Sequence, residues 1–137
     1  MPYLIDTNVL CESSKPKPAA PVLQWLAQHD AELHLSALSI GEMLKGIHLM
    51  DRGKRRLEIE NWFQRIDRWA AGRILPVDAG VMKTWAVFYA KHQRAGRRLP
   101  AIDSIVAATA LHHGLTLVTR NATDFPPDVT VLNPWVT

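Results

Sequence analysis

The chain has very little cysteine, since Cys11 is the only one among 137 residues. One cysteine cannot form an intramolecular disulfide, which argues against an oxidising compartment. The beginning of the sequence also lacks the apolar run of a signal peptide, because Asp6 interrupts it. The uncharged stretch Ser104–Leu111 is too short to cross a bilayer. We therefore expect a protein of the cytoplasm that has no membrane segment.

Several motifs that carry chemistry are absent as well. The six histidines show no H-E-x-x-H spacing, which argues against a zinc site of that kind. There is no G-x-x-x-x-G-K-[ST] loop and no G-x-G-x-x-G segment, so the common nucleotide-binding folds are disfavoured. A G-x-S-x-G elbow is missing too, which disfavours a serine hydrolase.

The composition is that of a globular protein, with 47% hydrophobic residues. We expect residues 1–137 to form one domain with a core that needs no covalent cross-links. The net charge is +3 and the isoelectric point is about 9.3. Basic residues cluster at 52–56 and 91–98. Each cluster is either a solvated helix end or a rim that contacts phosphates.

Segments whose apolar residues follow the period of a β-strand alternate along the chain with segments that follow the period of an α-helix. The expected strands are residues 2–6, 33–35, 74–77, 115–119 and 129–132, and the expected helices are residues 21–29, a helix from Ser39, 54–70, 81–92 and 100–113. This alternation predicts an α/β fold with a parallel sheet that is covered on both faces. Ligand sites in such folds lie beyond the carboxyl ends of the strands, where Asp6 is expected.

Four of the 13 acidic residues lie among apolar or small residues near the end of an expected element. Each has a structural explanation as well as a functional one. Asp6 is placed to cap a helix, and Glu42 fits a capping box with Ser39. Asp103 is placed to complement a helix dipole, and Asp124 to stabilise a turn.

Taken together, the four acids suggest a shared site. The helix of Asp103 carries the small residues Ala107, Ala108 and Ala110, which would let it approach the sheet closely. Several carboxylates in one cleft repel one another unless a cation neutralises them. Oxygen ligands without a cysteine or histidine set indicate Mg²⁺ or Mn²⁺.

Four segments resemble, in order, the motifs of PIN-domain proteins of the VapC and FitB kind: residues 4–10 (Leu-Ile-Asp-Thr-Asn-Val-Leu), 36–42, 100–110 and 117–125. The resemblance implies a three-layer α/β/α fold around a mostly parallel five-stranded sheet. It also implies that Asp6, Glu42, Asp103 and Asp124 hold Mg²⁺ or Mn²⁺. The polar residues expected to support this site are Thr7, Thr119 and Asn121, and Asn121 is an alternative to Asp124.

The resemblance further implies a toxin that hydrolyses RNA phosphodiesters. Asp6 and Asp103 would be the primary metal ligands, while Glu42 and Asp124 would bind a second ion or orient the attacking water. The expected RNA contacts are Arg97, Arg98 and Arg120. For Arg120, a surface pairing with a nearby acid is the alternative.

The expected partner is a VapB-like antitoxin that wraps the toxin, which would itself form a homodimer within a heterotetramer or larger assembly. Two aromatic-rich helices offer apolar surface for this partner: one carries Val22, Trp25 and Leu26, and the other carries Trp62, Phe63 and Trp69. Ordinary core packing is the alternative for these residues.

Three other functions compete with this prediction. A catalytically silent PIN module would bind RNA or a partner protein, although all four acids are present. A 5′-nuclease-like enzyme would cut DNA, but the chain lacks the extra helical segments with which such enzymes clamp DNA. A phosphoacceptor receiver domain is disfavoured because the early segment has one acid, and because Arg120 stands where a lysine is expected.

Overall fold

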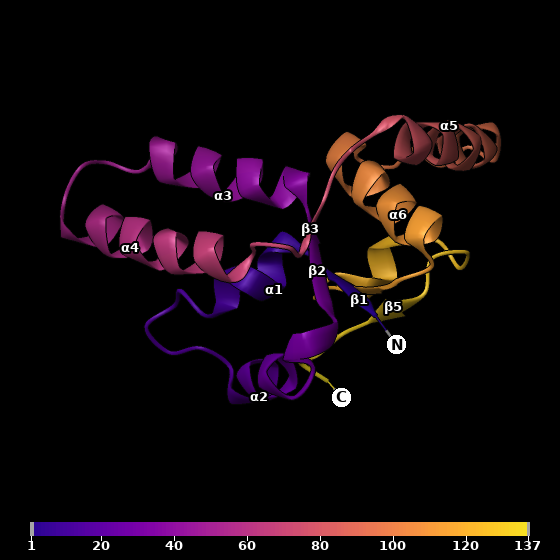
Figure 1. The fold of residues 1–137 in the computed structure, drawn as a ribbon. Helices are drawn as coiled ribbons and strands as arrows, with labels where there is room; N and C mark the ends of the chain where they lie inside the picture. The colour runs from indigo at the N-terminus through magenta and orange to yellow at the C-terminus, as the bar shows by residue number, and fades with distance from the viewer. Residues whose placement is uncertain (1, 137) are drawn as a thin grey trace.

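A five-stranded sheet forms the centre of the computed structural model, which describes residues 2–136 (Figure 1). The strands are β1 (Tyr3–Ile5), β2 (Leu33–Ser36), β3 (Ile74–Leu75), β4 (Thr116–Val118) and β5 (Val131–Leu132). All neighbouring strands pair in parallel, in the order β3-β2-β1-β4-β5. The predicted five-stranded parallel sheet is therefore confirmed.

Helices cover both faces of this sheet. They are α1 (Thr7–Glu12), α2 (Ala20–Gln28), α3 (Ala37–Leu49), α4 (Lys54–Trp69), α5 (Ala79–Arg94) and α6 (Ala101–His113). Helices α1 to α4 pack on one face, whereas α5 and α6 pack on the other (Figure 1). Short 3₁₀ turns, η1 (Asp30–Glu32) and η2 (Ala122–Asp124), complete the elements. The three-layer α/β/α prediction is thus confirmed.

The two central strands, β1 and β4, supply both cores. Successive side chains of a strand point to opposite faces. Leu4 and Leu117 pack on the α5–α6 face, while Ile5 and Val118 pack on the α1–α4 face. All four side chains are fully buried. A strand that is buried on both faces has a continuous apolar run, which is why these segments are recognisable in the sequence.

Helix α6 lies close to the sheet because its inner face is built from small residues. Ala107 and Ala110 pack with Leu4 and Leu117, and neither alanine is more than 1% exposed. The close approach that the sequence predicts is therefore confirmed. The helix ends at Gly114, whose positive φ of 66° forms a left-handed C-cap.

Several element boundaries differ from those predicted. Helix α3 begins at Ala37, and its N-cap is Ser36, whose hydroxyl accepts a hydrogen bond from Leu38 N at 3.1 Å. The capping box of Ser39 and Glu42 is therefore wrong, because both residues lie inside the helix. Pro100 is the N-cap of α6 and not its first helical residue. Strands β3 and β5 are each shorter than the predicted segments, with two residues apiece.

The strand order reverses beside β1. The chain proceeds from β1 to β2 and β3 on one side, and then places β4 and β5 on the other side. In open parallel sheets, ligand sites lie at such a switch point, beyond the carboxyl ends of the strands. Between residues 2 and 136, no helix combines the length and the apolar character that a membrane span requires. That residues 1–137 form one domain stays a prediction.

Candidate active site

Asp6 stands at the switch point, directly after β1. Its backbone N–H donates to Val118 O at 2.9 Å, which ties the end of β1 to the end of β4. One carboxylate oxygen, Oδ1, accepts from Thr7 N at 2.8 Å, as the predicted helix cap requires. The other oxygen, Oδ2, accepts from the Thr119 hydroxyl at 2.9 Å. Asp6 therefore caps α1 and also faces the neighbouring strand end.

The buried position of Asp6 disfavours a negative charge on its carboxyl group. Burial raises the pKa of Asp6 above its ordinary value, and the hydrogen bonds from Thr119 and Thr7 only partly oppose this. The charges of Asp103 and Glu42 raise the pKa further. These charge interactions show that the three carboxylates, which are far apart in the sequence, are close in space.

Glu42 reaches the same region from α3. Its Oε1 accepts a hydrogen bond of 2.7 Å from the Thr7 hydroxyl, whose oxygen also lies 2.9 Å from Ser39 Oγ. These contacts join the start of α1 to the second turn of α3. The Glu42 side chain therefore points toward Asp6 and does not return to its own helix N-terminus.

Asp103 and Asp124 approach from the other face of the sheet. Asp103 lies in the first turn of α6, and Asp124 is the last residue of η2. Both line one small recess beside Pro100. The pKa of Asp103 is raised by burial first, and then by the charges of Glu42 and Asp124. Asp6, Glu42 and Asp103 therefore interact with one another, whereas Asp124, which is exposed, interacts with Asp103 alone.

No basic residue neutralises this acidic cluster. Within residues 2–136, Asp6, Glu42, Asp103 and Asp124 take part in no ion pair. Oxygen donors with uncompensated charge suit a hard divalent cation. Among residues 2–136, there is no group of three or more Asp, Glu, His or Cys side chains that could hold a metal ion. That these four acids hold a metal ion therefore stays a prediction.

Thr119 is the centre of the supporting hydrogen bonds. Its side chain is fully buried, and its oxygen accepts from Asn8 Nδ2 at 3.3 Å and from Asn121 N at 3.2 Å. Asn121 therefore contributes its backbone to this network. The role of Asn8 was missed by the sequence reasoning, although it lies inside the Asp-Thr-Asn segment that resembles the first motif.

The predicted RNA contacts are not equivalent. Arg120 follows Thr119 in a bend. Its guanidinium lies 4.9 Å from the centre of the Trp135 ring, and its charge is one of the smaller influences that lower the pKa of Glu12. Arg97 and Arg98 are exposed in the segment before α6, near the helix start that carries Asp103. Arg97 Nη1 also lies 3.4 Å from His92 Nδ1.

Glu12 is a further buried acid, and no pattern in the sequence distinguishes it. Glu12 is 4% exposed at the end of α1, where its carboxylate pairs with Lys15 Nζ at 2.8 Å and accepts from Ala19 N at 2.8 Å. The Lys15 bond, followed by the Ala19 bond, lowers the pKa of Glu12. These contacts hold the connection between α1 and α2, so Glu12 has a structural role outside the acidic cluster.

The parallel sheet with acids at its carboxyl edge defines a known class. The PIN domain family model matches residues 3–126, and the chain belongs to that family. It is 38% identical to Toxin FitB of Neisseria gonorrhoeae, over 96% of this chain and 97% of that protein. It is 34% identical to VapC ribonuclease Y4jK of Sinorhizobium fredii, over 96% of each chain. The crystal structure of FitAcB from Neisseria gonorrhoeae has a chain that superposes with a TM-score of 0.88, at 37% identity, over 97% of this chain and 98% of that one.

Proposed function

We propose that this protein is a Mg²⁺- or Mn²⁺-dependent endoribonuclease that acts as the toxin of a toxin–antitoxin pair. The observation that carries the proposal is that Asp6 and Glu42 lie on either side of Thr7 at the switch point, that Asp103 and Asp124 line one recess, and that none of the four has a basic partner within residues 2–136. The names of the relatives, a toxin and a ribonuclease, support it. An RNA target would place this activity in the cytoplasm.

In this proposal the four acids have different roles. Asp6 and Asp103 would hold the ion, and Glu42 and Asp124 would bind a second ion or orient the attacking water. The ion supplies a more acidic water and offsets negative charge that builds on the phosphate. One carboxylate takes the proton of the water. Thr119 and Thr7 fix the orientation of Asp6 and Glu42 through the bonds described above.

The test uses the purified protein, free of any partner, with total RNA and Mg²⁺ or Mn²⁺. We expect cleavage that stops in EDTA and in Asp6→Asn and Asp103→Asn variants. Cleavage that persists in these variants would remove the mechanism. A preference for flap DNA over RNA would favour the 5′-nuclease alternative, and failure to bind Mn²⁺ in calorimetry would favour a silent module.

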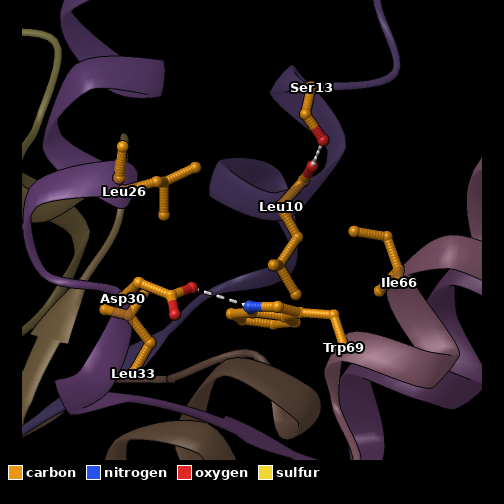
Figure 2. A pocket seen from close by; sticks show the side chains of 8 residues that line it. Leu10, Ser13, Leu26, Asp30, Leu33, Ile66 and Trp69 are labelled. Atoms are coloured by element: carbon orange, nitrogen blue, oxygen red, sulfur yellow. Dashed lines mark hydrogen bonds between the residues drawn. The ribbon is translucent and has the colours of Figure 1, made fainter.

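The proposed partner is an antitoxin, which needs apolar surface on the toxin. Of the expected residues, Val22, Trp25, Trp62 and Phe63 are at most 7% exposed, so they belong to the core. The remaining two, Leu26 and Trp69, line an open pocket of about 200 Å³ between α1, α2 and α4 (Figure 2).

The rim of this pocket is polar and well held. Trp69 Nε1 donates to Asp30 Oδ1 at 2.8 Å, and Arg73 lies over the Trp69 ring at 4.4 Å from its centre. We expect Leu26→Asp to abolish co-purification with the co-expressed antitoxin. A matched control is Val87→Asp on α5, where the side chain is 75% exposed and far from the pocket in sequence. Equal loss of co-purification in both variants would contradict antitoxin binding at this pocket.

A further inference from the structure

A second cavity opens directly from the acidic site. It has a volume of about 320 Å³ and lies along α3, with α1 and α4 as its other walls. Thr7 and Glu42 line it at one end, so the cavity and the candidate active site share two residues. Its walls are otherwise mostly apolar, and they include Met43, Ile59 and Trp62. We call this cavity the α3 groove.

One face of α3 gives the groove its length. Glu42 and Gly46 are spaced four residues apart on one side of the helix, and the C-cap residue Met50 continues this row just beyond the helix end. The row extends about 12 Å at the helical rise per residue. A Cβ at Gly46 would meet no atom within 4 Å, so glycine here leaves space next to the groove open.

The far end of the groove carries Arg55, whose guanidinium forms an exposed ion pair with Glu58. Arg55, near the start of α4, donates from Nη2 to Ser14 O at 3.0 Å and from Nη1 to Glu58 Oε2 at 3.3 Å. Its side chain is 48% exposed. A guanidinium has five N–H donors in a planar fork, so Arg55 keeps donors for an anion.

We propose that the α3 groove seats one nucleotide of the RNA substrate next to the phosphate that is cut. The base would lie against the half-buried Ile59, over a floor formed by the core residues Met43 and Trp62, and a phosphate would bind Arg55. Single-stranded RNA is read in this way, by bases held against apolar or aromatic side chains and phosphates held by arginine. This inference rests on the proposed ribonuclease activity and assigns base preference to the groove.

The charges of the groove favour a nucleotide over a cationic protein side chain. A nucleotide combines an apolar face with an anionic phosphate, and the groove combines an apolar wall with Arg55. A basic side chain would be attracted to Glu42 and repelled at the Arg55 end. A nucleotide that continues to the acidic site would depend on a divalent ion to offset repulsion there.

The experiment compares groove variants with matched controls in a randomised single-stranded RNA pool, with Mn²⁺ and sequencing of the cut ends. Gly46→Leu fills the groove, and Gly41→Leu makes the same change on α3 at an exposed glycine that does not line it. Leucine in place of a helix-interior glycine favours the helix, so both variants should fold. Arg55→Gln removes the far charge, and Arg65→Gln removes an exposed charge elsewhere on α4.

We expect Gly46→Leu to raise KM about tenfold and to flatten the base preference beside the cut, while Gly41→Leu matches the wild type. In a plot of log(1/KM) against log of the salt concentration, Arg55→Gln should reduce the magnitude of the slope by about 0.7, which is the value for one phosphate contact with a single strand. Arg65→Gln should leave this slope unchanged.

Three outcomes would overturn the inference. If the wild type cuts RNA and the groove variants keep its KM, salt slope and base preference, the groove is not a subsite, while the proposed function stands. If those variants lose only antitoxin capture, the groove seats a protein. If the wild type cuts no RNA under any metal condition, the proposed function and the inference both fall.

Discussion

Thr119 shows how much of the site depends on one hydroxyl group. It donates to Asp6 and accepts from two N–H groups, so its only proton is committed to the carboxylate. This fixes the direction of Asp6 Oδ2 and lowers the pKa of Asp6 against the larger effect of burial. We therefore treat Thr119 as a residue that positions the metal-binding acid.

Replacing Thr119 with valine keeps the shape of the side chain and removes this bond. We expect Thr119→Val to lose about 1–3 kcal/mol of unfolding free energy, since a buried bond to a charged group is removed. The pKa of Asp6 should rise further, so the acidic limb of the kcat/KM profile should move to higher pH. Thr119→Ser keeps a hydroxyl donor, so the acidic limb of its kcat/KM profile should lie at the same pH as in the wild type. A variant with an unshifted limb would contradict the positioning role.

The four acids themselves were predictable because each stands in an apolar neighbourhood where a charge is unexpected. The resemblance also named Thr7 and Thr119 as supporting residues, but which acid each one contacts was not predictable. Thr7 contacts Glu42 across 35 residues of sequence and Thr119 contacts Asp6 across 113, and neither pair has a spacing that a sequence pattern reveals. The same reason explains why Glu12, bonded to Lys15 and Ala19, was not distinguished from an exposed helix acid.

At the scale of elements, α3 decides where Glu42 points. The helix starts immediately after β2, with Ser36 as both the last strand residue and the N-cap. Starting the helix there places Glu42 in its second turn, facing Thr7. The sequence predicted the helix but began it at Ser39, because Ser36 and Ser39 are both good caps and only the paired length of β2 selects between them.

We expect Ser36→Ala to lower the free energy of unfolding by about 1 kcal/mol, because the Leu38 N–H loses its capping acceptor. Thermal or urea unfolding would measure this loss. Ser36→Thr, which keeps a hydroxyl acceptor, should retain most of the stability. Equal losses in the alanine and threonine variants would indicate that packing at this buried position, and not the cap, is responsible.

Long periodic elements were predicted best. The long helices α4, α5 and α6 and the inner strands β1 and β4 match the predicted segments within a few residues. Edge strands β3 and β5 were overestimated, because an apolar edge segment in the sequence looks the same whether or not it finds a pairing partner. Each of these strands pairs over two residues only.

At the scale of the whole molecule, two sets of acids change the stability of the fold in opposite directions as the pH changes. Asp6 and Asp103 have raised pKa values, so each destabilises the fold once the pH exceeds 3.8, its ordinary value. That cost disappears as the pH falls through the raised folded value. Glu12, Asp30 and Asp128 have lowered pKa values. Their stabilisation is complete above 4.5 for Glu12 and 3.8 for the two aspartates, and it is lost as the pH falls through the lower folded values.

We therefore expect the metal-free protein to become more stable as the pH falls from neutrality toward the raised pKa values, and less stable below about 4. Urea unfolding across this range would measure it. Saturating Mn²⁺ should remove the gain on acidification, because the ion requires the charged carboxylates. Asp103→Asn should raise metal-free stability at neutral pH and flatten the curve. Stability that only falls from neutrality would show that repulsion in the cluster is negligible.

The sequence by itself determined the α/β class, the parallel sheet, and the identity of four candidate acids, because apolar periodicity and isolated charges are local properties. The tertiary structure decided what no local property contains. It set the strand order that brings β1 beside β4, and it placed the Arg120 guanidinium over the Trp135 ring. It also placed Thr119 against Asp6, and it opened the α3 groove toward Arg55. These features depend on contacts between segments that are distant in the chain, and packing alone fixes them.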